Sequence, residues 1–455
     1  MNTTEINAAL TKNFGLDPAT SKALVVGAGE TGFSAARFFY RQGIKFAVVD
    51  SRDKPPQLET IRETMPDVAV FTGGFDDAAF KVATHLVVSP GVSLKESSII
   101  KALSSGVKII SDIDLLVSCV TAPIIAITGS NGKSTVTTMV GEMAKAAGKK
   151  VAVGGNLGTP ALDLLHTEAD LYVLELSSFQ LERTTLLNAA AATVLNVSSD
   201  HLDRHEGLSD YAQVKRKIFN GDGVMVLNAD DPLVRKMAAA DRKVATFAII
   251  TEAEFHLGNV GGADYLMRND HRLMALKELP LEGLHNAANA LAALALGFAV
   301  GLDERAMCNA LKKFRGLDHR MQKVAERLGV VWVNDSKATN IGACVAALQG
   351  YHQKVILIAG GDSKGADMRE LVPALKAKAK CVILMGKDAP LIETAISGAV
   401  PVHQAENVAQ AVRIAAKIAE TGDTVLLSPA CASLDQYKSY KDRGDRFAAA
   451  VLELP

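Results

Sequence analysis

Short runs of apolar and β-branched residues recur along the whole chain and alternate with segments whose apolar residues have helical spacing. Continuous apolar runs are typical of strands buried on both faces, and their alternation with helices is typical of parallel sheets. Ten such runs are Ala23–Val26, Phe46–Val49, His85–Val88, Ile124–Ile127, Leu171–Leu174, Val224–Leu227, Val331–Val333, Val355–Ile358, Cys381–Leu384 and Thr424–Leu427. The pattern therefore predicts an α/β fold.

Most of these runs are followed directly by a cluster of glycine and polar residues. Examples are the sequences GAG, DSR, SPG, TGSNGKS, ELSS, NADD, NDSKAT, GGDSKG and SPACAS. In open α/β sheets, ligands bind at the carboxyl ends of strands, where loop amides and helix N-termini converge. Turn formation alone explains some of these clusters. Sheets with such an edge in three parts of the chain suit a protein that grips a large ligand between domains.

The length of the chain indicates more than one domain. Its 455 residues exceed the size of a single hydrophobic core and correspond to roughly three domains of about 150 residues. Composition and the positions of the apolar runs predict domains at residues 1–111, 112–316 and 317–455. Within the second domain, the polar stretch Thr251–Leu279 predicts a small antiparallel excursion.

Charge and cysteine content restrict the partners and the compartment. Lys and Arg total 49 and Asp and Glu total 50. The chain therefore lacks the basic excess that would indicate binding to duplex nucleic acid or to an anionic membrane. Local basic clusters could still hold a small anion. Five cysteines without a C-x-x-C pair fit free thiols in a reducing compartment. Because we find no signal-peptide pattern and no apolar segment of membrane-spanning length, we expect a cytoplasmic protein.

The strongest chemical motif is IIAITGSNGKST at residues 124–135. An apolar run leads into a glycine-rich turn, and Lys133, Ser134 and Thr135 then open a helix. The N–H groups of such a turn form a nest for polyphosphate, the lysine neutralises the outer phosphates, and the hydroxyl reaches Mg²⁺. The spacing departs from G-x-x-x-x-G-K-[ST], since Gly129 lies only three residues before Gly132. The motif predicts a nucleotide site, with a plain glycine turn as the alternative.

A second glycine motif, GAGETG, contains Gly27, Gly29 and Gly32 and follows the first apolar run. Asp50 closes the next run, about 20 residues further on. This spacing is typical of a dinucleotide site in which loop amides hold a pyrophosphate and the carboxylate holds a ribose hydroxyl. A UDP-linked substrate offers the same two groups, so the motif does not distinguish NAD from a UDP derivative.

The second domain also contains candidate ligands for a hard cation: Glu175, the pair Asp200–His201, and Lys215. Carboxylate oxygens and a histidine suit Mg²⁺ that bridges phosphates better than they suit zinc. Each residue also has an ordinary structural interpretation. Glu175 could cap a helix, His201 could lie on the surface, and a lysine on a charged helix is most often solvated.

Seven motifs along nearly the whole chain resemble those of the Mur ligases, the ATP-dependent amide-forming enzymes that build the peptide of bacterial peptidoglycan precursors. They are TGSNGKST, GGNLG, LELSSFQLE, NVSSDHLDRH, NADDP, HNAANALAA and the pair His319–Arg320. NDSKATN, GGDSKGAD and LLSPACASLDQYKSYKDRG are similar to the branch of the family that adds D-glutamate. The resemblance implies a Rossmann-like UDP-binding domain, a central P-loop-type ATPase domain with a mostly parallel sheet, and a Rossmann-like C-terminal domain that binds the amino acid.

The resemblance also implies roles for residues of the central site. The expected catalytic residues are Lys133, Asn156, Glu175, His201 and Lys215. The expected ATP contacts are Gly129, Asn131, Gly132, Lys133, Ser134, Thr135, Asn289, Arg320 and Asp335. Two Mg²⁺ ions are expected, with Ser134 and Glu175 on one and His201 and Lys215 on the other. Lys215 would be carbamylated, which turns a cationic amine into an anionic oxygen ligand.

The two other substrates are expected in the outer domains. The UDP-linked substrate would contact Glu30, Thr31, Asp50, Ser51, Arg52, Ser89, Gly91 and Asn156. Glu30 is unusual beside a diphosphate, and we expect its backbone to make the contact. The carboxylates of D-glutamate would contact Lys337, Thr339, Lys364, Ser433 and Tyr440.

Together these roles predict an ATP-dependent ligase that joins D-glutamate to UDP-N-acetylmuramoyl-L-alanine through an acyl phosphate. We expect a cytoplasmic monomer whose partners are small molecules rather than nucleic acid or membrane. The alternatives are another Mur ligase, or a folylpolyglutamate synthetase-like ligase, which should lack the GAGETG block. An NAD-dependent dehydrogenase or dinucleotide-binding protein is an alternative of a different class, and it would leave TGSNGKST unexplained.

Overall fold

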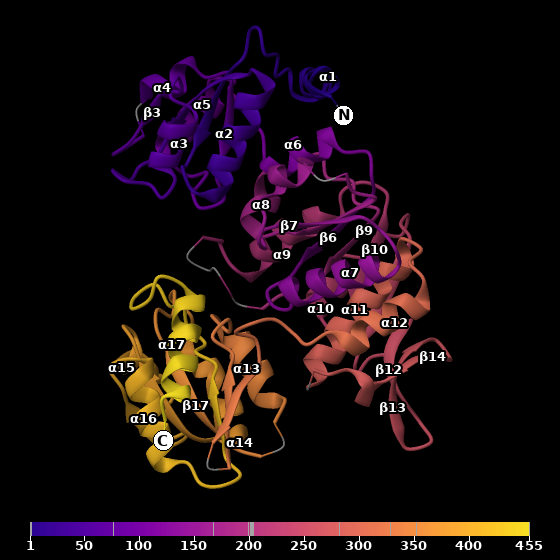
Figure 1. Ribbon diagram of the computed structural model, residues 1–455, viewed down its shortest axis with the longest axis vertical. Helices are drawn as coiled ribbons and strands as arrows, with labels where there is room; N and C mark the ends of the chain where they lie inside the picture. The colour runs from indigo at the N-terminus through magenta and orange to yellow at the C-terminus, as the bar shows by residue number, and fades with distance from the viewer. Residues whose placement is uncertain are drawn as a thin grey trace.

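Three α/β domains follow one another along the chain, each built on its own sheet (Figure 1). The computed structural model describes residues 2–75, 77–166, 168–198, 200, 204–281, 283–327, 329–351 and 353–454. All ten apolar runs predicted as strands lie in strands, so the α/β prediction is confirmed. In this part of the chain no helix is both long and apolar enough to cross a bilayer.

The N-terminal domain has a five-stranded sheet in the order β3-β2-β1-β4-β5, with every pair parallel. The strands are β1 (Lys22–Val26), β2 (Lys45–Val49), β3 (Val70–Phe71), β4 (His85–Val88) and β5 (Lys108–Ile109). The helices are α1 (Thr3–Phe14), α2 (Glu30–Gln42), α3 (Leu58–Thr64), α4 (Asp77–Val82) and α5 (Ser97–Ser104). The predicted Rossmann-like arrangement is confirmed, with the GAGETG loop between β1 and α2.

The central domain has a nine-stranded sheet in the order β14-β13-β12-β11-β10-β9-β6-β8-β7. Its parallel strands are β6 (Ile124–Thr128), β7 (Val151–Gly155), β8 (Leu171–Glu175), β9 (Ala191–Val194), β10 (Val224–Asn228), β11 (Val244–Ala248) and β12 (Phe255–Val260). The helices are α6 (Asp112–Cys119), α7 (Lys133–Ala146), α8 (Ser178–Arg183), α9 (Leu208–Arg216), α10 (Pro232–Arg235), α11 (Leu284–Ala299) and α12 (Glu304–Lys313), with 3₁₀ turns η1 (Ala161–His166), η2 (Lys217–Phe219) and η3 (Leu276–Glu278).

The edge of the central sheet changes direction where the sequence turns polar. Strands β13 (Ala263–Arg268) and β14 (His271–Ala275) pair antiparallel with β12 and with each other. These strands project away from the rest of the domain (Figure 1). The expected antiparallel excursion within Thr251–Leu279 is therefore confirmed.

The C-terminal domain has a six-stranded sheet in the order β15-β16-β20-β17-β18-β19, in which β15 alone is antiparallel to its neighbour among the described strands. The strands are β15 (Gln322–Arg327), β16 (Val330–Asn334), β17 (Val355–Gly360), β18 (Ala379–Met385), β19 (Val402–Gln404) and β20 (Thr424–Leu427). The helices are α13 (Ile341–Gln349), α14 (Val372–Lys378), α15 (Ala389–Ala395), α16 (Val408–Ile418) and α17 (Tyr440–Leu452), with the 3₁₀ turn η4 (Met368–Leu371). A mostly parallel sheet with helices on both sides again explains the fully apolar runs.

Candidate active site

The glycine-rich loop between β6 and α7 has the geometry of a phosphate-binding nest. Gly132 lies just before α7 with φ of 84°, in the left-handed region. A Cβ atom at Gly132 would lie 2.5 Å from Oδ1 of Asn289 on α11. The loop thus needs glycine for both its conformation and its close contact with α11. Beyond the loop, the N-terminus of α7 adds backbone N–H groups suited to an anion.

Two lysines converge on the carbonyls of this loop. Lys133 Nζ donates to the carbonyls of Gly129 (2.8 Å) and Ser130 (2.9 Å). Lys215 Nζ, from α9, donates to the same Gly129 carbonyl (3.0 Å). Two amines that share one carbonyl place two positive charges close together beside the phosphate loop, unless one of the amines is neutral or modified.

Lys215 is buried rather than solvated. Only 1% of the residue is exposed, and Nζ lies 4.3 Å from the centroid of the Tyr211 ring. Burial lowers the pKa of Lys215 well below its ordinary value, and Lys133 lowers that pKa further, against the opposing effect of acidic neighbours. The ordinary interpretation of this residue as a surface lysine is therefore wrong.

Glu175, the last residue of β8, supplies an unpaired carboxylate oxygen. Its Oε1 accepts a hydrogen bond from Asn156 Nδ2 (2.6 Å). Its Oε2 is buried and has no hydrogen-bond partner among the described residues. A buried carboxylate oxygen without a partner is costly unless a cation satisfies it. This oxygen fits the donor chemistry of Mg²⁺, so the residues present suit the expected ion.

The second expected metal position is only partly described. His201 lies outside the described residues, as do its neighbours at 202 and 203. Within the described part of the chain, no group of three or more His, Cys, Asp and Glu side chains is close enough to hold a metal. The Lys215 side chain is an unmodified amine that donates hydrogen bonds, and in this form it does not act as a metal ligand. The ligand set of the second ion stays a prediction.

The C-terminal domain reaches the phosphate loop through Asp200. Lys364 Nζ, from the loop after β17, lies 3.0 Å from Oδ1 of Asp200. Asn340 Nδ2 donates to Oδ2 of Asp200 (3.1 Å) and to Oδ1 of Asn131 (3.2 Å). These contacts join the loop after β17, the N-terminus of α13 and the phosphate loop into one site.

The segment that enters β15 also contacts the phosphate loop. Arg320 Nη2 donates to Oγ of Ser134 at the start of α7 (2.8 Å). Its neighbours His319 and Met321 have φ of 61° and 47°, and the N–H of Met321 donates to Asp335 (3.3 Å). The backbone here is held in an unusual conformation that directs Arg320 toward the central domain.

A cavity of about 1180 Å³ lies between the central and C-terminal domains. It is lined by Asn131, Gly132, Asn289, Arg320, Asp335 and Lys337, among others. Burial raises the pKa of the Asp335 carboxyl to about 7, although Ser428, Met321 and Arg320 all favour its charged form. The cavity has room for a nucleotide, since ligand sites commonly measure about 300–1,000 Å³.

In the N-terminal domain, Asp50 organises the loops at the ends of β1 and β2. Its Oδ2 accepts from the N–H of Ala28 (2.7 Å), and both carboxylate oxygens accept from the Arg52 side chain (2.9 and 2.7 Å). Burial alone would raise the pKa of Asp50, but the hydrogen bonds from Arg52 and Ala28 outweigh it and lower that pKa. Asp50 therefore already holds Arg52 and the glycine loop in place.

The other residues expected to contact the UDP-linked substrate lie around the same loops. Ser89 Oγ donates to the carbonyl of Gly27 (2.9 Å), which joins the loops after β1 and β4. Glu30 opens α2, and its exposed carboxylate accepts from Gln57 (2.5 Å). This placement agrees with a role for the Glu30 backbone. Ser51 and Gly91 lie in the loops after β2 and β4, and Thr31 lies in the first turn of α2, whereas Asn156 lies in the central domain beside Glu175.

The residues expected to bind D-glutamate lie on loops after β16, β17 and β20 and, in the case of Tyr440, at the start of α17. Lys337 Nζ is 4.0 Å from the centroid of the Tyr440 ring, and Thr339 follows two residues later. A backbone bridge between Asp362 and Ala432 sets the loop of Lys364 beside that of Ser433. Burial lowers the pKa of Lys337 to about 8, with Arg320 and Lys133 contributing.

Three residues of this site have a role that the sequence did not predict. Asp200, expected as a ligand for a cation, instead connects the two domains with Asn340, and Asn196 fixes the loop by accepting from the N–H of Asn131 (2.8 Å). All three lie inside motifs that resemble the Mur ligases, so their sequence position was the available signal. Their role depends on contacts between segments far apart in the chain.

Three α/β domains with a phosphate-binding loop, a buried lysine beside it and a nucleotide-sized cavity at a domain boundary define a nucleotide-dependent enzyme of the P-loop type. Three family models match this chain: Mur ligase MurD-like, N-terminal domain at residues 21–111, Mur ligase middle domain at 127–297, and Mur ligase, glutamate ligase domain at 319–431. The chain belongs to the Mur ligase family.

Curated relatives cover almost the whole chain. The UDP-N-acetylmuramoylalanine--D-glutamate ligase of Methylococcus capsulatus is 53% identical over 442 residues, covering 97% of this chain and 96% of the relative. The enzyme of the same name from Pseudomonas aeruginosa is 50% identical over 437 residues, covering 95% and 98%.

Solved structures support the fold. The pseudomurein peptide ligase type C from Methanothermus fervidus superposes with a TM-score of 0.63 at 20% identity, covering 95% of this chain and 99% of that one. Family membership excludes the dehydrogenase alternative. The match of residues 21–111 to a MurD-like N-terminal domain argues against a folylpolyglutamate synthetase-like ligase.

Proposed function

We propose that this protein is the ATP-dependent ligase that joins D-glutamate to UDP-N-acetylmuramoyl-L-alanine, with formation of an acyl phosphate. The observation that supports it best is a charged cluster from two domains: Lys133 and Lys215 share the Gly129 carbonyl, and Lys133 interacts electrostatically with Glu175, Asp200 and Lys364. An acyl phosphate is needed because amide formation from a carboxylate and an amine is uphill in water. The relatives that carry this activity in their names are about 50% identical over nearly the whole chain.

The phosphate loop would perform the phosphoryl transfer. Lys133 and the N–H groups at the start of α7 are placed to stabilise charge that builds on the transferring group. Arg320 reaches the same helix start through Ser134. The substrate carboxylate would take the γ-phosphoryl group of ATP, and the amine of D-glutamate would then attack the acyl carbon and expel phosphate.

Glu175 and Ser134 would hold a Mg²⁺ ion at this loop. The buried Oε2 of Glu175 supports this assignment because a cation would satisfy it. When bound, Mg²⁺ supplies electrostatic stabilisation of the phosphate oxygens. Asn156 holds the other carboxylate oxygen, so the free oxygen of Glu175 has a fixed direction.

We propose further that Lys215 is carbamylated. Burial lowers its pKa, which favours the neutral amine that can attack CO₂. The nitrogen lone pair forms the new bond to carbon, one C–O π bond moves onto oxygen, and the nitrogen releases a proton. The carbamate replaces the positive charge of Lys215 with an anionic oxygen ligand. Together with His201, this ligand would suit a second Mg²⁺.

The acidic substrate would be held where three loops of the C-terminal domain meet. Lys337, Lys364 and the hydroxyls of Thr339 and Ser433 suit two carboxylates. Tyr440 packs under Lys337 and fixes its direction. This arrangement requires D-glutamate to compete with Asp200 for Lys364.

The test of the function is phosphate release with ATP, Mg²⁺ and UDP-N-acetylmuramoyl-L-alanine, compared across several amines. The amines are D-glutamate, L-alanine, L-lysine, diaminopimelate and D-alanyl-D-alanine. We expect release with D-glutamate alone. Release with a different amine instead would assign the protein to another Mur ligase activity. Release with none of them would contradict the proposal.

A further inference from the structure

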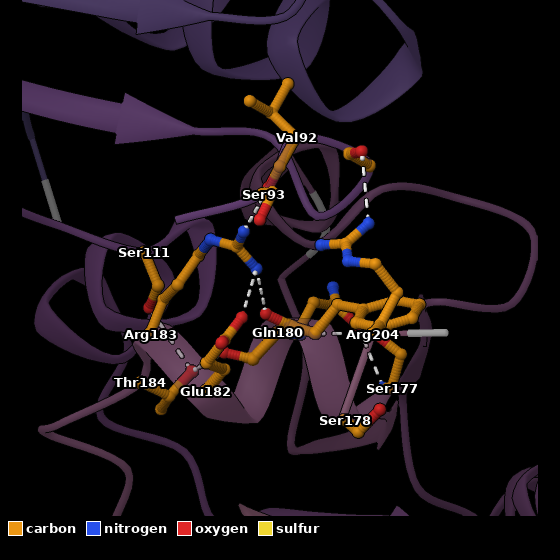
Figure 2. Close-up of polar contacts among 12 residues, drawn as sticks. Val92, Ser93, Ser111, Ser177, Ser178, Gln180, Glu182, Arg183, Thr184 and Arg204 are labelled. Atoms are coloured by element: carbon orange, nitrogen blue, oxygen red, sulfur yellow. Dashed lines mark hydrogen bonds and ion pairs between the residues drawn. The ribbon is translucent and has the colours of Figure 1, made fainter. Parts of the chain in front are cut away.

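Two arginines of the central domain grip the loop that follows β4 in the N-terminal domain. Arg183, at the end of α8, donates from Nη2 to the carbonyl of Val92 (2.5 Å) and from Nη1 to the carbonyl of Phe179. Arg204 donates from Nη1 to the carbonyl of Gly91 (3.4 Å). Figure 2 shows both guanidinium groups directed from the central domain toward this loop. Two consecutive carbonyls of one domain are therefore held by the next.

Arg183 is a charged side chain in a buried position. Its side chain is 1% exposed, and its Nε is buried without a hydrogen-bond partner among the described residues. Burial lowers its pKa to about 10, and Glu182, 3.4 Å away, opposes that shift. A guanidinium group still carries its charge near neutral pH at such a pKa. A buried ion pair is weak evidence that a residue stabilises the fold. The burial of Arg183 therefore indicates a role other than stabilisation.

The two arginines form one unit around Phe179. The guanidinium carbon of Arg204 lies 4.7 Å from the centroid of the Phe179 ring. The ring of His205 is stacked on the same ring at 5.8 Å, with 3° between the planes, and its Nε2 lies 3.1 Å from Oγ of Ser178. The segment around Arg204 is thus packed onto α8.

This unit connects two parts of the proposed site. The gripped loop carries Ser89 and Gly91, which are expected at the UDP-linked substrate. Arg183 lies on the helix that starts just after Glu175, and Arg204 lies four residues after Asp200. A shift of the loop after β4 would therefore displace both segments that carry acidic residues of the central site.

We infer that Arg183 and Arg204 form an interdomain clamp and act as positioning residues for the reaction. The clamp aligns the anionic UDP-linked substrate, bound in the N-terminal domain, with the phosphate loop of the central domain. This inference rests on the proposed function. It is distinct from substrate binding, because the arginines hold backbone carbonyls and touch no reacting atom. Misplacement of reacting groups by about 1 Å can lower a rate about 10²-fold.

The test compares Arg183→Lys, Arg204→Ala and the double variant with the control Lys95→Ala. Lysine keeps the charge at position 183 but cannot bridge two carbonyls as a fork. The control removes the exposed pair between Lys95 and Glu206 (3.0 Å) at the same domain boundary. We expect kcat to fall at least tenfold in the double variant. The affinity for ATP alone and for the UDP-linked substrate alone should stay within about threefold, and the control should match the wild type.

A distance measurement separates positioning from a structural role. Spin labels on Arg62→Cys in the N-terminal domain and Lys149→Cys in the central domain report the separation of the two domains. The five native cysteines are buried and would not react. We expect a broader distance distribution in the double variant. Unchanged kcat, or a lower kcat with an unchanged distance distribution, would overturn the inference.

The design also covers folding and the proposed function. Thermal unfolding shows whether each variant is folded at the assay temperature. If Arg183→Lys is unfolded, the test relies on Arg204→Ala, a change at a partly exposed residue, with kcat and the distance distribution as the two measurements. If the wild type fails to use D-glutamate, the proposed activity is wrong, yet the distance distributions still test the clamp. If the wild type is active and the distributions are identical, the clamp alone fails.

Discussion

At the scale of single residues, the site is governed by charges that lie close together in a buried or half-buried position. Lys133 and Lys215 share the Gly129 carbonyl, and the nearby Glu175 keeps one carboxylate oxygen unpaired. Burial lowers the pKa of Lys133, while Glu175 and Asp200 oppose that shift. Such a cluster is costly to fold and is typical of functional sites. The chemistry of each residue was evident from the sequence, but its burial was not.

Replacement of Lys215 tests the carbamate. We expect Lys215→Ala to lower kcat about 10²-fold or more, because a ligand to the phosphate site is lost. Short carboxylic acids should restore part of the activity by supplying the missing oxygens. Lys215→Arg should stay inactive, since arginine does not form this carbamate, and Arg216→Ala, on the exposed side of α9, should be unaffected. A ¹³C signal from labelled bicarbonate should appear only in the wild type and Arg216→Ala; full activity of Lys215→Arg would contradict the carbamate.

The pH dependence of D-glutamate use tests Lys337. Its pKa is lowered to about 8, so it carries its charge below pH 8 and loses it above. Each further pH unit reduces the charged fraction about tenfold. We expect kcat/KM for D-glutamate, divided by the value for Lys337→Arg, to fall about tenfold from pH 7 to pH 9. Dividing by the Lys337→Arg value removes the effect of titration of the substrate amine. As a control, Lys441→Arg should have the same pH dependence as the wild type. A ratio that stays constant with pH would show that Lys337 does not bind the carboxylates.

At the scale of elements, the site is assembled from the carboxyl ends of strands. The phosphate loop follows β6, Glu175 ends β8, and the loops after β16, β17 and β20 carry the residues expected at D-glutamate. Parallel strands bring their carboxyl ends to one edge, which explains why residues far apart in the chain meet. Elements therefore place the functional groups, and short loops set their final direction.

The loop between β6 and α7 can be tested with the two glycines that flank this helix. Gly132 has φ of 84° and a Cβ would lie 2.5 Å from Asn289, whereas Gly148, after α7, has φ of 79° and open space around it. Both alanine variants carry about 1–2 kcal/mol of left-handed strain. We expect Gly132→Ala to raise KM for ATP at least tenfold and Gly148→Ala to leave it unchanged. Equal KM values in steady-state assays would show that contact with α11 does not shape the nucleotide loop.

At the scale of the whole molecule, several polar contacts between the three domains lie close to the site. The clamp of Arg183 and Arg204 joins the first two domains, and Asn340, Lys364 and Arg320 join the last two. The first two domains also share an apolar cluster that includes Phe38 and Leu162, and relative motion of domains within one chain is the usual expectation. Closure of the domains around the substrates is therefore a prediction of the architecture.

The joint between the central and C-terminal domains can be loosened without removing a helix cap. Asn340 caps α13 through Oδ1 and reaches Asn131 and Asp200 through Nδ2. Asn340→Asp keeps the cap but places a second negative charge beside Asp200. We expect a larger radius of gyration by solution scattering and a KM for ATP raised about tenfold, as for the loss of about 1.4 kcal/mol. Asn407→Asp, at the cap of α16, is the control, and equal scattering for the two variants would rule out a role of Asn340 in closure.

The strands, the phosphate loop and the chemical types of the site residues could all be predicted from the sequence. Their signals are local, because burial of both faces of a strand and the turn before α7 each depend on a few neighbouring residues. Which polar groups meet across domains depends on the tertiary structure. Asn340 and Asn131 are 209 residues apart, and Arg183 and Val92 are 91 apart. No periodicity records such pairs, since they depend on how one packed domain lies against the next.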